Sequence, residues 1–307
     1  MLKYLLLLIG FFLLIKGADV FVEGSASVAG LLKIPSLIIG LTVVSMGTSA
    51  PEAAVSITAA LENSEAIAVS NVIGSNIFNI LIVAGTCALI KPVIVNTSII
   101  KRDLPFCIGA TLVVLILAIN KSFSRLDGII MLLLFIAYMV IMVVSGIRSK
   151  NQSEEEYKIM SPLKSMIYIV IGIAAVILGG NLVVDNSVLI AQSFGVSETI
   201  IGLTIISVGT SLPELVTSIV ATRKGQTDIA LGNAIGSCIF NVIFILGASS
   251  AIKPIAFSLN SVFDIAVSLG VAVFALIFTV RDKKLNRFQG AIFLFAYAAY
   301  LVFIFVR

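Results

Sequence analysis

The 307-residue sequence contains no histidine, and only 12% of its residues are charged. The absence of histidine removes the usual proton carrier near neutral pH and the commonest nitrogen ligand of transition metals. Soluble domains carry roughly 25% charged residues, so the low charge and a mean hydropathy of +1.17 exclude an ordinary soluble fold. The formal net charge of +4 is spread over connecting segments, so nucleic-acid binding is not expected.

Cysteine is also scarce. Cys87, Cys107 and Cys238 all lie in apolar segments and lack the C-x-x-C spacing of metal and redox motifs. This pattern excludes a disulfide framework or a zinc site and predicts three buried thiols. We expect no bound cofactor and no obligatory protein partner, and the chain is not expected to be an enzyme.

Long apolar runs are abundant. Ten of them approach or exceed the length of about 20 residues that an α-helix needs to cross a bilayer. The first run contains Lys3 but is not followed by a small-residue cleavage site, so we interpret it as a retained span. The sequence therefore predicts an all-α integral membrane protein with ten transmembrane helices in the cell membrane.

The two halves of the chain align at a constant offset of 162 residues, which pairs Gly17 with Gly179 and Asn71 with Asn233. Because each half has an odd number of helices, five, the second half must enter the membrane from the opposite side. Two inverted repeats are an architecture of secondary transporters. The predicted units are the first five-helix repeat (1–147), a cytoplasmic linker (148–161) and the second five-helix repeat (162–307).

Basic residues predict the orientation. With the N-terminus outside, 14 Lys and Arg residues fall in cytoplasmic loops and five on the opposite side. The positive-inside rule therefore predicts that both termini are extracytoplasmic. The linker carries Glu154, Glu155 and Glu156, which we interpret as a solvated connector; a regulatory Ca²⁺ site is the alternative.

A six-residue segment occurs twice, as Gly47–Glu52 (Gly-Thr-Ser-Ala-Pro-Glu) and Gly209–Glu214 (Gly-Thr-Ser-Leu-Pro-Glu). Each copy lies inside an apolar run, where a proline and a carboxylate are both costly. Pro51 cannot donate to the Gly47 carbonyl and its ring displaces Thr48, so we expect a helix break in each copy. Freed carbonyls, two hydroxyls and a glutamate then form a cluster of oxygen ligands suited to Na⁺ or Ca²⁺.

A second segment, Asn71–Asn79, returns as Asn233–Asn241. Within it Ser75 and Asn79 are four residues apart, so a helix places the hydroxyl and the amide on one face, and the second copy repeats this with Ser237. Both faces are expected to point toward the glutamates. For Asn71, Asn233, Gly74 and Gly236, close helix packing is an equally good interpretation.

The glutamates indicate a cation site because an unpaired carboxylate at bilayer depth costs roughly 2.5 kcal/mol or more. Glu52 and Glu214, each bidentate, and the carbonyls of Thr48 and Thr210 provide six oxygens, the low end of what Ca²⁺ takes. Two carboxylates also neutralise one divalent ion. Neutral oxygens that suit Na⁺ come from the hydroxyls of Ser49, Ser211, Ser75 and Ser237, the amides of Asn79 and Asn241, and the carbonyls of Ser45 and Ser207.

These paired motifs, in five-helix inverted repeats, resemble the α-repeats of the sodium/calcium exchangers, particularly the compact prokaryotic members. The resemblance covers essentially the whole chain. It implies that Ca²⁺ leaves the cell in exchange for Na⁺, usually three, at overlapping sites, while helices 1 and 6 slide across a fixed core. It assigns the residues named above as the ligand set for transported Na⁺ and Ca²⁺.

One position departs from part of that family. Several relatives carry Asp in the second repeat where this chain has Asn241, and in the potassium-dependent branch that carboxylate is associated with K⁺ transport. Asn241 therefore implies K⁺ independence. It also leaves a nominal site charge of −2 from Glu52 and Glu214, so three Na⁺ leave +1 and one Ca²⁺ leaves zero, which predicts electrogenic exchange.

Other functions stay open. A Ca²⁺/H⁺ antiporter of the same superfamily would alternate Ca²⁺ and protons on the glutamates, although such relatives typically show G-N-x-x-E in place of G-T-S-x-P-E. A cation channel or a non-transporting scaffold is further from the pattern. Asp19, Glu23 and Asp185 are kept outside the site, because a local pair between Lys16 and Asp19 explains the first of them.

Overall fold

The computed structural model describes residues 2–62, 64–120, 122–149, 159–195 and 207–306. Most of the acidic linker and the first part of the helix expected from residue 198 therefore lie outside the described residues. The exact limits of the three predicted units stay a prediction.

The helices follow the predicted order. In the first half they are α1 (Leu2–Leu32), α2 (Ser36–Ile39), η1 (Gly40–Val44), α3 (Ser45–Thr48), α4 (Ala50–Leu61), α5 (Glu65–Phe78), η2 (Asn79–Ala84), α6 (Gly85–Ile90), η3 (Ile99–Asp103), α7 (Leu104–Ile119) and α8 (Arg125–Arg148). In the second half they are α9 (Pro162–Ser193), α11 (Ser207–Gly209), α12 (Leu212–Arg223), α13 (Thr227–Ile239), η5 (Phe240–Ile245), α14 (Leu246–Ile252), α15 (Leu259–Asp282) and α16 (Arg287–Val306).

The helical membrane fold is confirmed. Across the described ranges, eight helices are long and apolar enough to cross a bilayer, and the bent pair Ser36–Thr48 and Ala50–Leu61 forms one further span. The repeat mate of that bent span includes α11 and α12. The segments η1, η2, η3 and η5 are π-helical, which the sequence did not predict.

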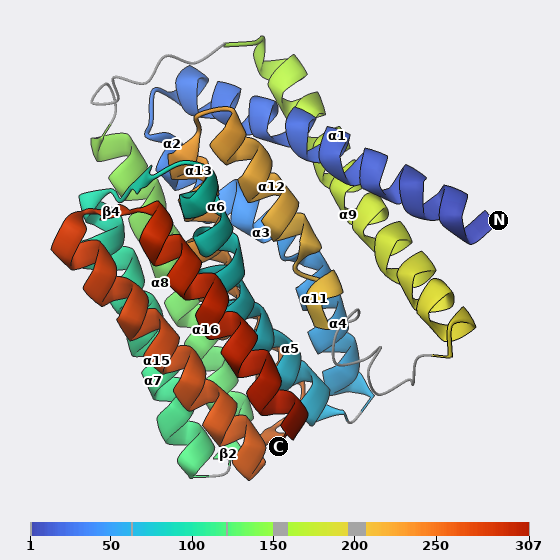
Figure 1. The fold of residues 1–307 in the computed structure, drawn as a ribbon. Helices are drawn as coiled ribbons and strands as arrows, with labels where there is room; N and C mark the ends of the chain where they lie inside the picture. Colours follow the sequence, from blue (N-terminus) through green and yellow to red (C-terminus); the bar gives the residue numbers. More distant parts are fainter. Residues whose placement is uncertain (1, 63, 121, 150–158, 196–206, 307) are drawn as a thin grey trace.

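Four two-residue strands are the only departure from an all-α fold among the described residues: β1 (Val93–Ile94), β2 (Ser122–Phe123), β3 (Ile255–Ala256) and β4 (Lys284–Leu285). β1 pairs with β4 and β2 pairs with β3, both antiparallel. The 162-residue offset turns the first pairing into the second, so they are one contact made twice. Figure 1 shows β4 and β2 at opposite ends of the bundle, as inverted repeats require.

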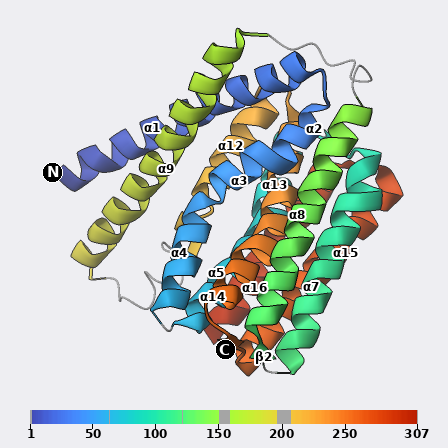
Figure 2. The ribbon, with the colours of Figure 1, turned by 180° about the vertical axis from the view of Figure 1, so that it is seen from behind.

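The core lies along two helices that are largely hidden from the bilayer. The span Thr227–Ile252 has 94% of its most apolar window buried and Glu65–Ile90 has 72%, against 17% for the C-terminal helix α16. Helices α7, α8, α15 and α16 lie on one flank of this pair, as both views show (Figures 1 and 2). Polar residues of the central pair are therefore shielded from lipid.

On the opposite flank α1 and α9 lie side by side as a long, tilted pair (Figures 1 and 2). Glycines set their close approach. A Cβ atom on Gly179 would lie 2.5 Å from the Leu14 amide nitrogen, and one on Gly17 would lie 2.8 Å from the Ala175 Cβ. Such small-residue contacts are typical of tightly crossed membrane helices.

The two halves also interlock on the other flank. A Cβ on Gly128 of α8 would lie 2.5 Å from the Ala251 nitrogen in α14, and one on its repeat mate Gly290 would lie 2.6 Å from the Gly85 oxygen in α6. Each half therefore packs its last helix against the central helix of the other half. This arrangement brings the two Gly-Thr-Ser-x-Pro-Glu segments, Gly47–Glu52 and Gly209–Glu214, together in the core. They are called the signature segments below.

Candidate ion-binding site

Both signature segments break a helix, as their prolines predict. α3 ends at Thr48, Ser49 has φ −84° and ψ 10°, and α4 begins at Ala50 with Pro51 in its first turn. The two parts of the span are bent by 50°. The second copy has the same break, with Ser211 at φ −90° and ψ 5° ahead of α12.

The break places each glutamate at a helix N-terminus. Glu52 lies in the first turn of α4 and Glu214 in the first turn of α12, and neither side chain is exposed. Unpaired backbone N–H groups make a helix N-terminus favourable for a negative charge. The same local geometry that the proline forces therefore lowers the cost of burying each carboxylate.

The first half of the site centres on Glu214. Ser49 Oγ, from the other repeat, donates to Glu214 Oε1 at 2.7 Å and lies 2.9 Å from Ser237 Oγ. Ser237 Oγ is also 3.4 Å from Glu214 Oε1 and 3.5 Å from the Ser45 carbonyl oxygen. Residues from both repeats thus converge on one carboxylate.

The second half repeats this geometry around Glu52. Ser211 Oγ donates to Glu52 Oε1 at 2.9 Å and lies 3.0 Å from Ser75 Oγ. Ser207 is the first residue of α11, and its side chain lies outside the described part of the chain. The six hydroxyl and carboxyl groups of the two halves therefore form two equivalent clusters across the repeat interface.

Several polar atoms of the predicted ligand residues have no protein partner among the described residues. Glu52 Oε2 and Glu214 Oε2 are buried without a hydrogen bond, and so are Asn241 Oδ1 and both amide atoms of Asn79. Buried polar atoms in native proteins are nearly always satisfied by protein, water or a bound ion. Carboxylate and amide oxygens left in this way are ligands that Na⁺ and Ca²⁺ accept.

The two threonines of the signature segments bond across the repeats. Thr48 Oγ1 donates to Asn233 Oδ1 at 2.9 Å, and the Asn233 amide donates to the Glu214 carbonyl oxygen at 3.3 Å and to Ser218 Oγ at 2.9 Å. The side chain of Asn233 therefore ties the broken helix of one repeat to the glutamate of the other.

The mirror contacts involve Thr210, Asn71 and Ser56. Thr210 Oγ1 donates to Asn71 Oδ1 at 3.3 Å, and the Asn71 amide donates to the Glu52 carbonyl oxygen at 3.2 Å and to Ser56 Oγ at 2.9 Å. For these asparagines the sequence left packing and function equally open. Sequence reasoning missed Ser56 and Ser218, whose signal is the 162-residue offset and their position four residues after each glutamate.

The two further amides lie where the central helices change form. Asn79 begins the π-helical segment η2, and Asn241 is the second residue of η5. A π-helical turn shifts the following side chains around the helix axis, and such turns are frequent at functional sites. Asn241 Nδ2 donates to Asn76 Oδ1 at 3.1 Å.

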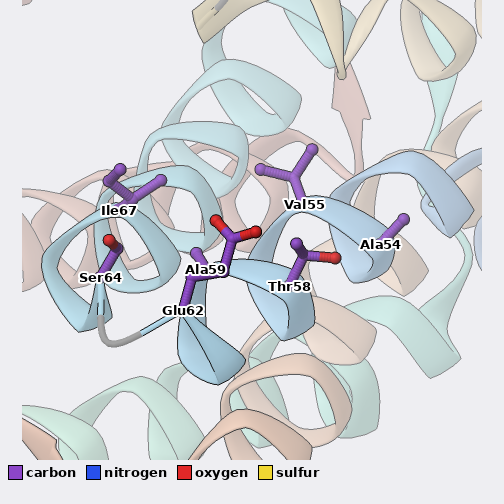
Figure 3. Close-up of a pocket in the computed structure, with 7 residues that line it drawn as sticks. All are labelled: Ala54, Val55, Thr58, Ala59, Glu62, Ser64 and Ile67. Carbon is purple, nitrogen blue, oxygen red and sulfur yellow. The ribbon is translucent and has the colours of Figure 1, made fainter.

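A hollow leads toward the site from the side of α9. A cavity of about 160 Å³ is lined by residues of both breaks, among them Pro51 and Thr210, and by Asp185 of α9. A larger cavity of about 420 Å³ shares the lining residue Val55 with it. Figure 3 shows Val55 and Thr58 of α4, and Glu62 directly after it, lining this second cavity.

Burial differs between the cavity and the equivalent place on the other face. Thr217 and Val22, the repeat mates of the cavity-lining residues Val55 and Val184, are fully buried, whereas Val55 and Val184 are not. Packing is therefore tighter around Val22 than around its mate beside Asp185.

Two ion pairs lie beside this place. Lys224 Nζ contacts Asp19 at 2.6 Å and Glu23 at 2.8 Å, so Asp19 pairs across to the end of α12 and the expected pair with Lys16 is wrong. Partial burial lowers the pKa of Lys224, but the hydrogen bonds to the two carboxylates outweigh this and raise it overall. The repeat mate of Lys224 is Glu62, which has the opposite charge.

The described residues hold no group of three or more His, Cys, Asp or Glu side chains placed to share a metal ion. The three cysteines are free and buried, as expected. The ionisable side chains of the candidate site are the two carboxylates of Glu52 and Glu214, and its other polar groups are neutral.

Comparison with known proteins identifies the family of the chain. The family model "Sodium/calcium exchanger protein" matches residues 2–144 and again 164–306. The chain is 40% identical to a putative antiporter, CaxA, of Alkalimonas amylolytica, over 97% of each protein. It is 31% identical to the sodium/calcium exchanger MaX1 of Methanosarcina acetivorans, over 99% of this chain and 98% of the relative.

A solved structure has the same fold. The sodium-calcium exchanger NCX_Mj, soaked with 10 mM Na⁺ and no Ca²⁺, superimposes with a TM-score of 0.87 at 31% identity over 98% of both chains. The family model covers nearly the whole chain in two halves, so the protein is a multi-pass transporter and not an enzyme. The chain belongs to the sodium/calcium exchanger family.

Proposed function

We propose that this protein is a secondary-active antiporter that exchanges Na⁺ for Ca²⁺ by alternating access. The observation that carries the proposal is the reciprocal pair of contacts from Ser49 to Glu214 and from Ser211 to Glu52, each leaving the second carboxylate oxygen buried and unbonded. Because each half of the site needs residues from both repeats, a relative movement of the repeats' helices changes ion binding directly.

The proposed ligands are those predicted from the two motifs. Ca²⁺ takes the two carboxylates and nearby carbonyls, which gives it hard oxygens and charge neutrality. Na⁺ takes hydroxyl, amide and carbonyl oxygens around the same glutamates. The complete set is Glu52, Glu214, Thr48, Thr210, Ser49, Ser211, Ser75, Ser237, Asn79, Asn241, Ser45 and Ser207.

The site charge sets the coupling. With both glutamates ionised and Asn241 neutral, the site carries −2, so three Na⁺ and one Ca²⁺ leave it with different net charges. Exchange is then electrogenic. The neutral amide at position 241 also supports transport that does not require K⁺.

The α1 and α9 pair is the proposed moving part. The two helices pack against each other through glycine contacts. They contact α12 through an apolar cluster and through the ion pairs of Lys224. The distribution of basic residues supports extracytoplasmic termini, which orients the cavity beside Asp185 outward and the Lys224 ion pairs toward the cytoplasm.

The deciding experiment is ⁴⁵Ca²⁺ uptake into proteoliposomes loaded with Na⁺. We expect uptake driven by the Na⁺ gradient, stimulated by a membrane potential of the correct sign and unaffected by K⁺. Uptake driven by a proton gradient and indifferent to Na⁺ would identify a Ca²⁺/H⁺ antiporter. Flux without a fixed Na⁺:Ca²⁺ ratio would indicate a channel.

The site is tested by Glu52→Gln and Glu214→Gln, each of which removes one charge with little change in shape. Exchange should fall by roughly tenfold or more, equivalent to about 1.4 kcal/mol of lost ion stabilisation. Glu65→Gln is the control. Glu65, the first residue of α5, pairs with Lys253, and partly exposed ion pairs contribute little to stability. Wild-type exchange in either site variant would defeat the assignment.

A further inference from the structure

The two repeats differ at one buried position beside the candidate site. Asn76 occupies the place that Cys238 takes in the second repeat, and both side chains are almost fully buried. The two residues contact each other: Asn76 Nδ2 donates to the Cys238 carbonyl oxygen at 3.2 Å, and Cys238 Sγ lies 3.7 Å from the Asn76 carbonyl oxygen. They therefore meet where the two central helices cross.

This contact fixes which way round the Asn76 amide lies. A main-chain carbonyl oxygen only accepts hydrogen bonds, so the atom that faces Cys238 must be the nitrogen of Asn76. Its Oδ1 then faces Asn241, whose Nδ2 donates to it at 3.1 Å. The Cys238 carbonyl thus sets the orientation of the Asn76 amide and, through it, that of the Asn241 amide.

The orientation of Asn76 also determines where Asn241 Oδ1 lies. With its nitrogen held by Asn76, the side chain presents its oxygen on the other side, where that oxygen is buried and has no protein partner among the described residues. Within the described part of the chain, the repeat mate Asn79 has no such anchor, because neither of its amide atoms has a hydrogen-bond partner there. One amide is fixed and its counterpart is not.

We propose that Asn76 is a positioning residue that holds Asn241 with its carbonyl oxygen, and not its NH₂ group, toward the transported cation. The inference rests on the proposed function and adds a residue outside its ligand set. An amide has one end that attracts a cation and one that repels it, so an Asn ligand needs a fixed orientation. A carboxylate at position 241 would have two equivalent oxygens and would need no such partner.

That difference gives the test. Asn76→Ala and the similarly sized Asn76→Leu are each made in the natural chain and in an Asn241→Asp background, and the KM for Na⁺ and the maximal rate of Na⁺-driven ⁴⁵Ca²⁺ uptake are measured in proteoliposomes. Outer partners of metal ligands typically contribute about 10- to 100-fold in affinity. With Asn241 present, we expect KM to rise by about tenfold; in the Asn241→Asp background, by less than about twofold.

Cys238→Ala is the matched control. It keeps the main-chain carbonyl that orients Asn76 and removes only the thiol, so KM should stay within about twofold of the natural chain. Na⁺-dependent thermal shifts of the detergent-solubilised proteins provide a second readout that does not depend on turnover. The shift at a given Na⁺ concentration should shrink in the Asn76 variants only when residue 241 is Asn.

An equal loss in both backgrounds would mean that Asn76 has a general packing role and would overturn the inference. An unchanged KM in the Asn241 background would overturn it as well. Both results leave the proposed function standing as long as the natural chain exchanges Na⁺ for Ca²⁺. Absence of Na⁺-driven Ca²⁺ uptake by the natural chain would instead refute the proposed function.

Discussion

Ser49 and Glu214 belong to different repeats, yet Ser49 Oγ donates to Glu214 Oε1 at 2.7 Å in a buried site. Ser211 and Glu52 repeat the contact at 2.9 Å. Neither half of the site is complete within one repeat. Helix breaks 162 residues apart therefore depend on each other for the placement of their carboxylates.

The symmetry predicts matched effects for the two serines. Ser49→Ala and Ser211→Ala each remove a hydrogen bond to a carboxylate, an interaction that contributes about 1.5–3 kcal/mol. We expect both variants to raise the Na⁺ concentration for half-maximal Ca²⁺ exchange by roughly tenfold, which is about 1.4 kcal/mol.

Ser193→Ala is the control for this pair, since Ser193 Oγ donates within its own turn, to the Ile190 carbonyl, at the exposed end of α9. Sodium titrations of ⁴⁵Ca²⁺ uptake measure all three variants. A large effect of one site serine with none from the other would contradict a shared, symmetric site.

Sequence reasoning predicted the parts of the site that follow from local chemistry. Pro51 cannot continue the hydrogen-bond ladder of a helix, so the break at Ser49 was predictable from one residue. The 162-residue offset then predicted that the second break lies at Ser211. The inverted arrangement followed from the odd helix count.

The rest depends on tertiary contacts that leave no local signal. A π-helical turn such as the one beginning at Asn79 has no distinctive residue pattern and is stabilised by its surroundings. The same holds for the ion pairs of Lys224, whose partner Asp19 is 205 residues away. Lys16 was the nearer partner in sequence, and the structure has a different one.

The glycine contacts between α1 and α9 predict a sharp sensitivity to added volume. In Gly179→Val the new side chain meets main-chain atoms, with a Cβ position 2.5 Å from the Leu14 nitrogen and 2.8 Å from the Gly10 oxygen. Neither atom moves without shifting α1, so we expect a loss of about 1–3 kcal/mol of stability. Thermal unfolding in detergent measures it.

Gly109→Val in α7 is the matched control. Gly109 also lies within a membrane helix, but an added Cβ there has nothing within 4 Å. Its melting temperature should stay close to that of the natural chain. If Gly179→Val melts like Gly109→Val, the close crossing of α1 and α9 is not a stabilising contact.

The ion pairs of Lys224 predict a conformational bias. Lys224→Met removes the charge that joins α12 to Asp19 and Glu23, while the apolar cluster beneath it is kept. We expect faster amide hydrogen exchange in α1 around Asp19 and in the last turn of α12. Lys16→Met is the control, because Lys16 is exposed on the same helix.

The pH dependence of this contact follows from its charge. The pKa of Lys224 is raised above the ordinary lysine value of about 10.4. A raised lysine pKa means that the contact contributes fully below the unfolded value and is lost as pH rises through the folded value. Hydrogen exchange at α12 should therefore show no Lys224-dependent change between about pH 6 and pH 9.

Reversing the charge at position 224 distinguishes the electrostatic attraction between Lys224 and the two carboxylates from the packing of the side chains. Lys224→Glu faces two carboxylates and should open the contact further than Lys224→Met, because like charges then meet in a partly buried setting. Adding Asp19→Lys restores one opposite pair and should return hydrogen exchange in α12 toward the natural level. If the double variant exchanges as fast as Lys224→Glu alone, the contact between α1 and α12 is held by the apolar cluster, and the ion pairs do not contribute to it.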